Sequence, residues 1–357
     1  MVCQLAITSM SLGRCYAGHS FARKLDAAAK YGYEGIELFH EDLADVAYKL
    51  SKETPSPSGP SQQAQLAAAR HIWSLCQARG IQVLCLQPFS QYDGLLDRAE
   101  HDRRLEQLRF WFDLARELHT DIIQVPANFL PAQQVTEDLN LIVSDLREVA
   151  DMGLQASPPI RFAYESLCWS TRVHTWERCW EVVRRVDRPN FGLCLDTFNI
   201  AGRIYADPTV PSGKTPDAED AVRESIARLV RQVDVNKVFY VQVVDAAKLS
   251  EPLVLGHAFY DPEQPARMSW SRKCRLFYGE KNRGAYLPIR EISEAFFRGL
   301  GFQGWVSLEL FNRRMDDADW DVPDELARRG AISWAKLQKH MGFKTSMALS
   351  DKEHAFL

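Results

Sequence analysis

The sequence lacks long apolar runs, and it has no large excess of charge of one sign. No segment of its 357 residues approaches the ~18–20 apolar residues that a helix needs to cross a bilayer, which excludes a membrane-spanning protein. No basic stretch precedes an apolar run near the N-terminus, so we expect no secretory leader and a cytoplasmic location. With 43 Lys and Arg against 47 Asp and Glu, the net charge of −4 makes nucleic acid a poor partner.

Paired cysteines and several familiar binding motifs are also missing. The eight cysteines form no C-x-x-C pair, and several of them, such as Cys85 and Cys194, lie in apolar runs. We therefore predict buried free thiols rather than a disulfide framework or a zinc cluster. No G-x-G-x-x-G follows the first apolar run, which disfavours a dinucleotide-binding sheet, and neither a P-loop nor a G-x-S-x-G nucleophile motif occurs.

The sequence does contain a regular alternation of short apolar runs and longer amphipathic segments. The eight apolar runs are of strand type, at 5–9, 35–39, 83–87, 122–126, 161–165, 191–196, 238–243 and 305–310. Segments with helical period lie between them, several followed by a glycine that suits a helix C-terminus, at 21–31, 63–79, 98–118, 137–152 and 292–300. Eight alternating units predict a single (β/α)8 TIM barrel over residues 1–345, with a tail at 346–357, rather than an open doubly wound sheet.

Two segments interrupt this alternation. Residues 51–61 are rich in Pro and Ser, and this composition predicts a mobile surface loop. Residues 249–288 form a long insert after the seventh predicted strand. Because structureless loops of this length are rare unless they have a function, we expect the insert to lie over the barrel mouth as a lid or a binding loop.

Four oxygen-bearing side chains lie at or next to the ends of four successive predicted strands: Glu165, Asp196, Gln242 and Glu309. The active site of such a barrel lies at the carboxyl ends of its strands, so we expect these side chains to converge. Three converging carboxylates repel one another and lose hydration, and a divalent cation removes both penalties. Oxygen ligands favour Mg²⁺ or Mn²⁺, with Co²⁺ as a further candidate, over zinc. Helix capping or ordinary ion pairing of each residue is the alternative.

A basic cluster in the insert and a histidine after the second strand complete the candidates. The cluster, which starts just before the insert, suits the capture of an anionic small molecule, with a solvated loop face as the alternative, and consists of Lys248, Arg267, Arg272, Lys273, Arg275, Lys281 and Arg283. His40 lies among Glu37, Glu41 and Asp42, which we expect at the barrel mouth. Its ordinary pKa near ~6.5 suits a general acid or base, and a structural role is the alternative.

The motifs around these residues resemble those of the 3-dehydroshikimate dehydratases, above all the family of fungal quinate catabolism, within the wider xylose-isomerase-like barrels. The resemblance extends over nearly the whole chain, through 5–13 (LAITSMSLG), 35–43 (GIELFHEDL), 164–169 (YESLCW), 194–199 (CLDTFN), 241–249 (VQVVDAAKL), 269–272 (SWSR) and 307–312 (SLELFN). It implies a lyase that removes water from a small-molecule substrate, 3-dehydroshikimate, to give protocatechuate. It also implies a divalent metal on the four strand-end residues, with Ser271 and Arg275 contacting the substrate and Lys248 close by.

One position departs from the family pattern. Bacterial members have a histidine where this chain has Asn199, and an amide cannot transfer protons near neutral pH. His40, Lys248, Tyr164 and a metal-bound water are the remaining candidates for the proton-transfer group. A metal-dependent sugar isomerase or epimerase on the same barrel and a non-catalytic metabolite-sensing barrel are the alternative functions, and association into homo-oligomers is left open.

Overall fold

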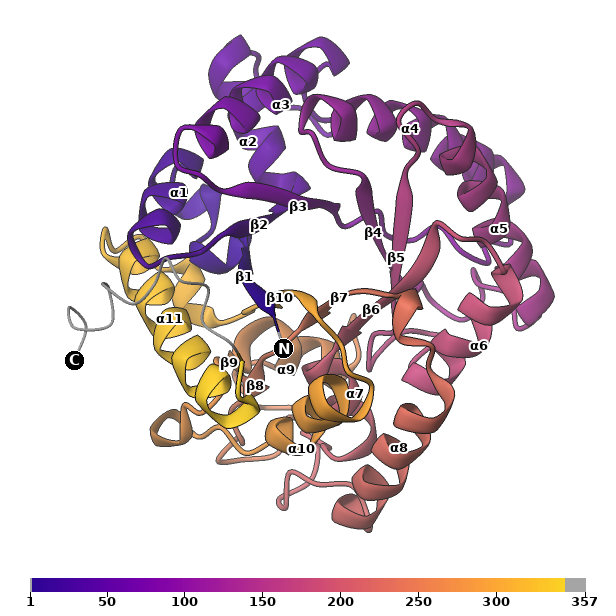
Figure 1. The fold of residues 1–357 in the computed structure, drawn as a ribbon, viewed down its shortest axis with the longest axis vertical. Helices are drawn as coiled ribbons and strands as arrows, with labels where there is room; N and C mark the ends of the chain where they lie inside the picture. The colour runs from indigo at the N-terminus through magenta and orange to yellow at the C-terminus, as the bar shows by residue number, and fades with distance from the viewer. Residues whose placement is uncertain (1, 344–357) are drawn as a thin grey trace.

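Eight parallel strands form a closed barrel in the computed structural model, which describes residues 2–343 (Figure 1). Around the barrel the strands follow the order β1-β10-β7-β6-β5-β4-β3-β2. They are β1 (Cys3–Thr8), β2 (Gly35–Phe39), β3 (Gln82–Gln87), β4 (Ile122–Pro126), β5 (Arg161–Glu165), β6 (Phe191–Asp196), β7 (Val238–Gln242) and β10 (Gly304–Leu308). The predicted (β/α)8 barrel is therefore confirmed, with four strands at the expected bounds.

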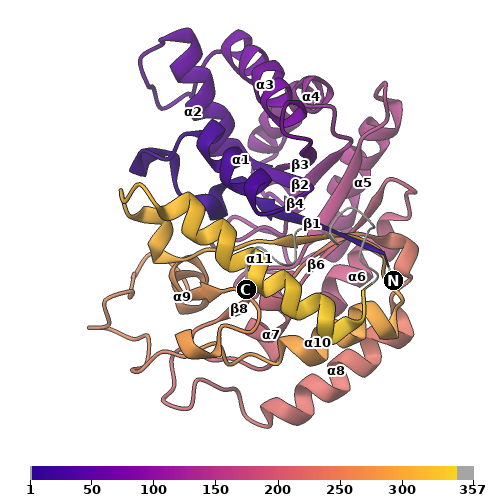
Figure 2. The same cartoon turned by 60° about the vertical axis from the view of Figure 1, so that its left-hand side comes forward.

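Helices surround the barrel on its outside (Figure 1). They are α1 (Phe21–Lys30), α2 (His40–Ser51), α3 (Gln62–Gln77), α4 (Arg98–Glu117), α5 (Leu139–Gln155), α6 (Trp176–Val186), α7 (Thr197–Ile204), α8 (Ala218–Gln232), α9 (Ala266–Cys274), α10 (Ile289–Glu294) and α11 (Val322–Met341). The last helix, α11, packs beside α1 and so closes the helical layer (Figure 2). None of the helices within residues 2–343 is both long and apolar enough to cross a membrane.

The five predicted helical segments correspond to α1, α3, α4, α5 and α10, the last of which continues into a π-helical turn at Ala295–Gly299. Helix α2 was not predicted, because its first residues were interpreted as an acidic cluster at the barrel mouth. Glu41 and Asp42 in fact occupy its first turn, where their negative charge interacts favourably with the positive end of the helix dipole.

Two hydrophobic clusters explain why the strands of the barrel consist of nearly continuous apolar runs. The larger cluster packs the outer faces of the strands against the helices, with side chains such as Ile36, Phe162 and Val183. The smaller cluster joins side chains from six strands in the barrel interior: Ala6, Leu84, Cys85, Ile122, Ala163, Cys194 and Tyr240. Burial on both faces demands apolar residues at successive positions of a strand.

The segments that interrupt the alternation are only partly irregular. Between β7 and α10, the two-residue strand β8 (Asp245–Ala246) pairs antiparallel with β9 (Arg275–Leu276), and α9 precedes β9 directly. The predicted insert 249–288 thus contains regular elements. Residues 52–61 join α2 to α3 and are mostly exposed, while the predicted tail 346–357 lies outside the described residues. All eight cysteines are free and six are buried, as expected.

Candidate metal centre

A polar layer lies above the small apolar cluster in the barrel interior. Successive side chains of a strand alternate between its two faces, so residues two apart both point inward. On β5, Ala163 in the apolar cluster is followed by Glu165, and on β6, Cys194 is followed by Asp196. This layer lies at the carboxyl ends of the strands, where TIM barrels carry out their chemistry.

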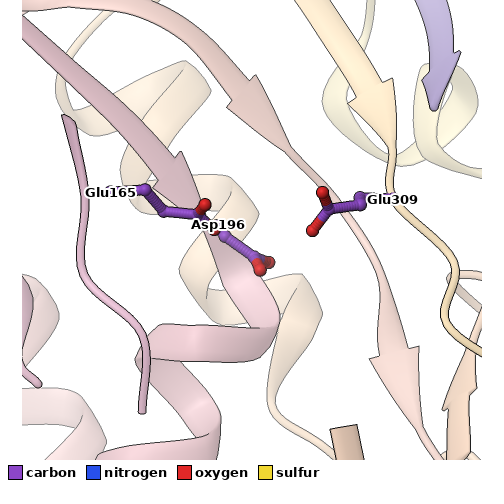
Figure 3. Close-up of side chains that lie close together, drawn as sticks. All are labelled: Glu165, Asp196 and Glu309. Carbon is purple, nitrogen blue, oxygen red and sulfur yellow. The ribbon is translucent and has the colours of Figure 1, made fainter. Parts of the chain in front are cut away.

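Three of the four predicted ligands converge in this layer. One carboxylate oxygen each from Glu165, Asp196 and Glu309 lies within 4.8 Å of the others. The three side chains come from β5, the end of β6 and the residue after β10, and they are directed into the space between them (Figure 3). All three are buried, with at most 4% of each residue exposed. The fold thus brings together three predicted residues that are far apart along the chain.

The electrostatics of these carboxylates favour a positive partner. Burial raises the pKa of Glu165 well above its ordinary value, and the charges of Glu309 and Asp196 raise it further. Burial also raises the pKa of Asp196, although the nearby Arg275 lowers it. The pKa of Glu309 rises to about 8, again through burial and against the effect of Arg275. The three acids therefore need a countercharge to be ionised together.

Gln242, the fourth predicted ligand, presents an unused oxygen. Its strand, β7, lies between β6 and β10 in the barrel, so Gln242 lies between the strands that carry Asp196 and Glu309. Its Nε2 donates to both carboxylate oxygens of Glu37, at 3.2 and 3.0 Å. Its Oε1 is buried and has no hydrogen-bond partner among the described residues. Three carboxylates and a free amide oxygen fit a hard divalent cation.

Side-chain amides orient the carboxylates. The Nδ2 of Asn199 donates to Glu165 Oε1 at 2.8 Å and to Asp196 Oδ2 at 2.7 Å. Gln124 donates to Glu165, and Gln87 donates to Glu309 at 3.2 Å. The sequence analysis missed Gln87 and Gln124, although both end or nearly end predicted strands and the same strand-end rule selects them. Asn199 therefore holds two predicted ligands in place of transferring protons.

The capping and ion-pairing alternatives are also realised in part. Asp196 Oδ1 accepts the N–H of Phe198 at 2.7 Å and so caps α7. The Nη1 of Arg275 lies 3.0 Å from both Asp196 Oδ2 and Glu309 Oε2. One oxygen of Asp196 thus serves the helix, while the other lies in the candidate site with the guanidinium.

Of the predicted substrate contacts, Arg275 and Ser271 lie at this site and Lys248 does not. Arg275 is 1% exposed, its Nε donates to Ser271 Oγ at 3.1 Å, and its guanidinium packs over the rings of Phe198 and Phe311. Lys248 is exposed, and its side chain lies near Gly213, in the loop between α7 and α8.

The acidic cluster expected around His40 is divided among three environments. Glu37 is fully buried in the barrel interior, and not at the mouth, because it points inward from β2. Asp42 forms a buried ion pair with Lys24 of α1 at 2.6 Å. Glu41 lines a cavity. His40 itself stacks on Trp111, with ring centroids 5.1 Å apart.

Within residues 2–343, neither His40 nor Tyr164 forms a hydrogen bond with Glu165, Asp196 or Glu309. The Nε2 of His40 lies 3.2 Å from Gln65 Oε1, and burial lowers the pKa of the imidazole. The hydroxyl of Tyr164 donates to Asp93 Oδ2 at 2.9 Å, and burial raises its pKa well above the ordinary value. The assignment of either residue to proton transfer stays a prediction.

A cavity of about 600 Å³ lies beside the site rather than around it. Residues of the 249–288 segment line it together with residues at the end of β2 and after β1 and β10, including Arg14, Phe39, Phe259, Arg272, Phe311 and Asp316. None of the four predicted ligands lines the cavity. Phe311 joins the two places, because it lines the cavity and also packs under the Arg275 guanidinium.

Comparisons with known proteins agree with this architecture. Residues 25–337 match the profile of the xylose isomerase-like TIM barrel family. The chain is 72% identical over 337 residues, 94% of each chain, to a 3-dehydroshikimate dehydratase of Neurospora crassa. It is 29% identical, over 81% of its length, to a 3-dehydroshikimate dehydratase of Pseudomonas aeruginosa, of which the match spans 36%. The structure of the IolI protein with a bound zinc atom is similar in fold, with a TM-score of 0.66 and 16% identity over 94% of this chain and 99% of that one.

Proposed function

Because the chain belongs to the xylose isomerase-like TIM barrel family, we propose that it is a 3-dehydroshikimate dehydratase, which removes water from 3-dehydroshikimate to give protocatechuate. The observation that carries the proposal is the 72% identity to the Neurospora crassa dehydratase over 94% of both chains. An alignment of this length includes the barrel and the segments that surround its mouth. A cytoplasmic location and association with other copies of the chain stay predictions from the sequence.

The second part of the proposal is a divalent cation, Mg²⁺ or Mn²⁺ with Co²⁺ as a further candidate, held by Glu165, Asp196, Gln242 and Glu309. Support comes from the three buried carboxylates within 4.8 Å and from the free Oε1 of Gln242. All four donors are oxygen atoms, which suit hard cations. When bound, such a cation supplies Lewis acidity that makes a C–H next to a ketone more acidic.

Arg275 and Ser271 are the proposed contacts to the substrate carboxylate. The positive, planar guanidinium suits a carboxylate, and because its Nε and Nη1 already donate to Ser271, Asp196 and Glu309, Nη2 is the nitrogen proposed to reach the substrate. Phe198 and Phe311 hold its plane, with ring centroids 4.3 and 4.9 Å from the guanidinium carbon. Ser271 fixes the Nε end of the same group. Lys248 stays a candidate third contact, which its exposed side chain leaves free to move.

Among the candidates for proton transfer, His40 offers a basic nitrogen. The Gln65 oxygen next to its Nε2 can only accept a hydrogen bond, so Nε2 bears the hydrogen and Nδ1 carries the lone pair. Burial lowers the pKa of His40, so the imidazole is neutral and able to accept a proton near neutral pH. Tyr164 already donates its hydroxyl hydrogen to Asp93.

The proposal is tested by following the ultraviolet absorbance of an aromatic product from 3-dehydroshikimate. We expect turnover with added Mn²⁺ or Mg²⁺, loss of turnover after chelation, and recovery when the cation is returned. Glu165→Gln should abolish turnover while the protein stays folded. Asp145→Asn is the matched control, since Asp145 is a buried acid on α5 that contacts none of the proposed ligands, and it should retain turnover.

The alternatives give different results. A sugar isomerase or epimerase would form no aromatic product from 3-dehydroshikimate and would interconvert sugars instead. A metabolite-sensing barrel would bind the cation and the substrate without turnover. Full activity after complete chelation would remove the cation from the proposal and leave the dehydratase assignment standing.

A further inference from the structure

Glu37 is the centre of a hydrogen-bond network inside the barrel. The residue is completely buried on β2, and its two carboxylate oxygens accept hydrogen bonds from five oxygen or nitrogen donors, beside a longer one from the thiol of Cys85 at 3.7 Å. The donors come from four other strands: Thr8 at 3.0 Å, Gln87 at 2.9 Å, Tyr240 at 2.9 Å, Gln242 at 3.0 and 3.2 Å, and Ser307. With donors on four other strands, its position depends on β1, β3, β7 and β10 as well as on β2.

The network determines which end of the Gln242 amide faces the candidate metal centre. An ionised carboxylate only accepts hydrogen bonds, whereas a primary amide has a donor end and an acceptor end. Glu37 therefore takes the NH₂ group of Gln242. The oxygen must then point the other way, and the buried Oε1 indeed has no hydrogen-bond partner among the described residues. A buried amide oxygen without a partner is costly unless something else binds it.

We propose that Glu37 is a positioning residue of the metal centre, which directs Oε1 of Gln242 toward the bound cation without being a ligand itself. This inference rests on the proposed cation site. It explains why position 242 has an amide and not a carboxylate. A carboxylate there would lie about 3 Å from the carboxylate of Glu37, and the two would repel each other. Gln87 extends the same network to a second ligand, since its Nε2 also lies 3.2 Å from Glu309 Oε1.

A double-mutant cycle on the pair tests the proposal, with Mn²⁺ affinity of the full chain as the readout, measured by titration calorimetry. Glu37→Gln lets the facing amide turn either way, so we expect Mn²⁺ binding to weaken by about tenfold or more. Gln242→Glu alone places two carboxylates face to face and should also weaken binding. The exchange Glu37→Gln with Gln242→Glu restores one donor and one acceptor, and it should return the affinity to within about threefold of the wild type.

The sign of the coupling decides the matter. Gln242→Glu must lower the Mn²⁺ affinity when residue 37 is Glu and raise it when residue 37 is Gln. An effect of the same direction in both backgrounds, or a folded Glu37→Gln protein that binds Mn²⁺ like the wild type, would overturn the proposal. If Glu37→Gln fails to fold, the exchange variant, which preserves the total charge of the pair, still shows whether Glu37→Gln restores the affinity that Gln242→Glu loses, and no recovery would overturn the proposal.

Asp145→Asn again serves as the matched control. It neutralises another buried carboxylate that accepts several hydrogen bonds, from Gly94 and Arg98, but lies outside the network. It should lower the stability of the protein and leave its Mn²⁺ affinity unchanged. If Asp145→Asn weakened Mn²⁺ binding as much as Glu37→Gln does, the loss of any buried charge would have the same effect, and the proposal would be overturned. A wild-type protein that binds no Mn²⁺ would instead remove the proposed cation site itself, and this inference with it.

Discussion

Replacement of Arg275 by methionine should destabilise the cation-free protein and have a much smaller effect on the Mn²⁺-loaded protein. The guanidinium is 1% exposed and lies 3.0 Å from both Asp196 Oδ2 and Glu309 Oε2. Removal of one partner from a buried ion pair costs about 3–5 kcal/mol, because the other charge is left uncompensated. Methionine keeps the apolar stem that packs against Phe198 and Phe311, so little of this cost comes from lost packing.

The assay is urea unfolding followed by tryptophan fluorescence at pH 8, with chelator or with saturating Mn²⁺. In chelator we expect the free energy of unfolding of Arg275→Met to fall by about 3–5 kcal/mol. With Mn²⁺ for both proteins at about 100 times the dissociation constant of the wild type, binding to the native state alone adds about 2.7 kcal/mol to the wild type. The variant should gain more than the wild type, because in the variant the cation replaces the only nearby positive charge among the described residues.

Arg329→Met provides the comparison. Arg329 also forms a largely buried ion pair, 2.8 Å from Glu280, but it contacts none of the proposed ligands. Its replacement should therefore cost a similar free energy with and without Mn²⁺. The reasoning is refuted if Arg275→Met loses no stability in chelator, or if Mn²⁺ stabilises Arg275→Met and Arg329→Met by the same amount.

Four further predictions address the site and its surroundings. Asn199→Leu removes the amide that donates to Glu165 and Asp196, and calorimetry should show Mn²⁺ binding weakened by about tenfold, so unchanged binding would contradict its role. Arg275→Ala should raise KM for 3-dehydroshikimate strongly in steady-state assays, and an unchanged KM would exclude the substrate contact. His40→Ala should lower kcat much more than Tyr164→Phe, whereas a normal kcat for His40→Ala would exclude His40 as the base. Burial raises the pKa of Asp93 from 3.8 to about 7, so the native state binds this proton more tightly than the unfolded chain. The free energy of unfolding should therefore gain about 1.4 kcal/mol from this group as the pH falls from 8 to 6. Urea unfolding of Asp93→Asn at the two pH values should show that this gain is lost, and an unchanged gain would exclude Asp93 as its source.

The barrel could be predicted from the sequence because a strand buried on both faces leaves a local signature. The runs at 35–39, 122–126, 161–165 and 191–196 coincide with observed strands. Helix α2 escaped prediction because it begins at His40, the residue directly after β2 ends, so no turn residues separate the two elements. Its acidic first turn has the same composition as a cluster of mouth carboxylates, and the sequence does not distinguish the two.

The proposed ligands could be selected for a similar reason. Residues two apart on a strand share a face, and strand ends of a parallel barrel share an edge, so Glu165, Asp196 and Gln242 had to lie near one another once the strands were placed. The same rule extends to Gln87 at the end of β3, which donates a hydrogen bond to Glu309. Residue type and strand position do not separate a ligand from the residue that orients it.

The sequence by itself determined the alternation of strand and helix and which side chains end the strands, because both follow from short-range periodicity and burial. Only the tertiary structure decided which partners each of those side chains contacts. Glu37 lies inside the barrel because five donors from other strands surround it, and Arg275 lies among the carboxylates although 79 residues separate it from Asp196. Hydrogen bonds and ion pairs of this kind depend on distances between segments remote in the chain, and no local pattern encodes those distances.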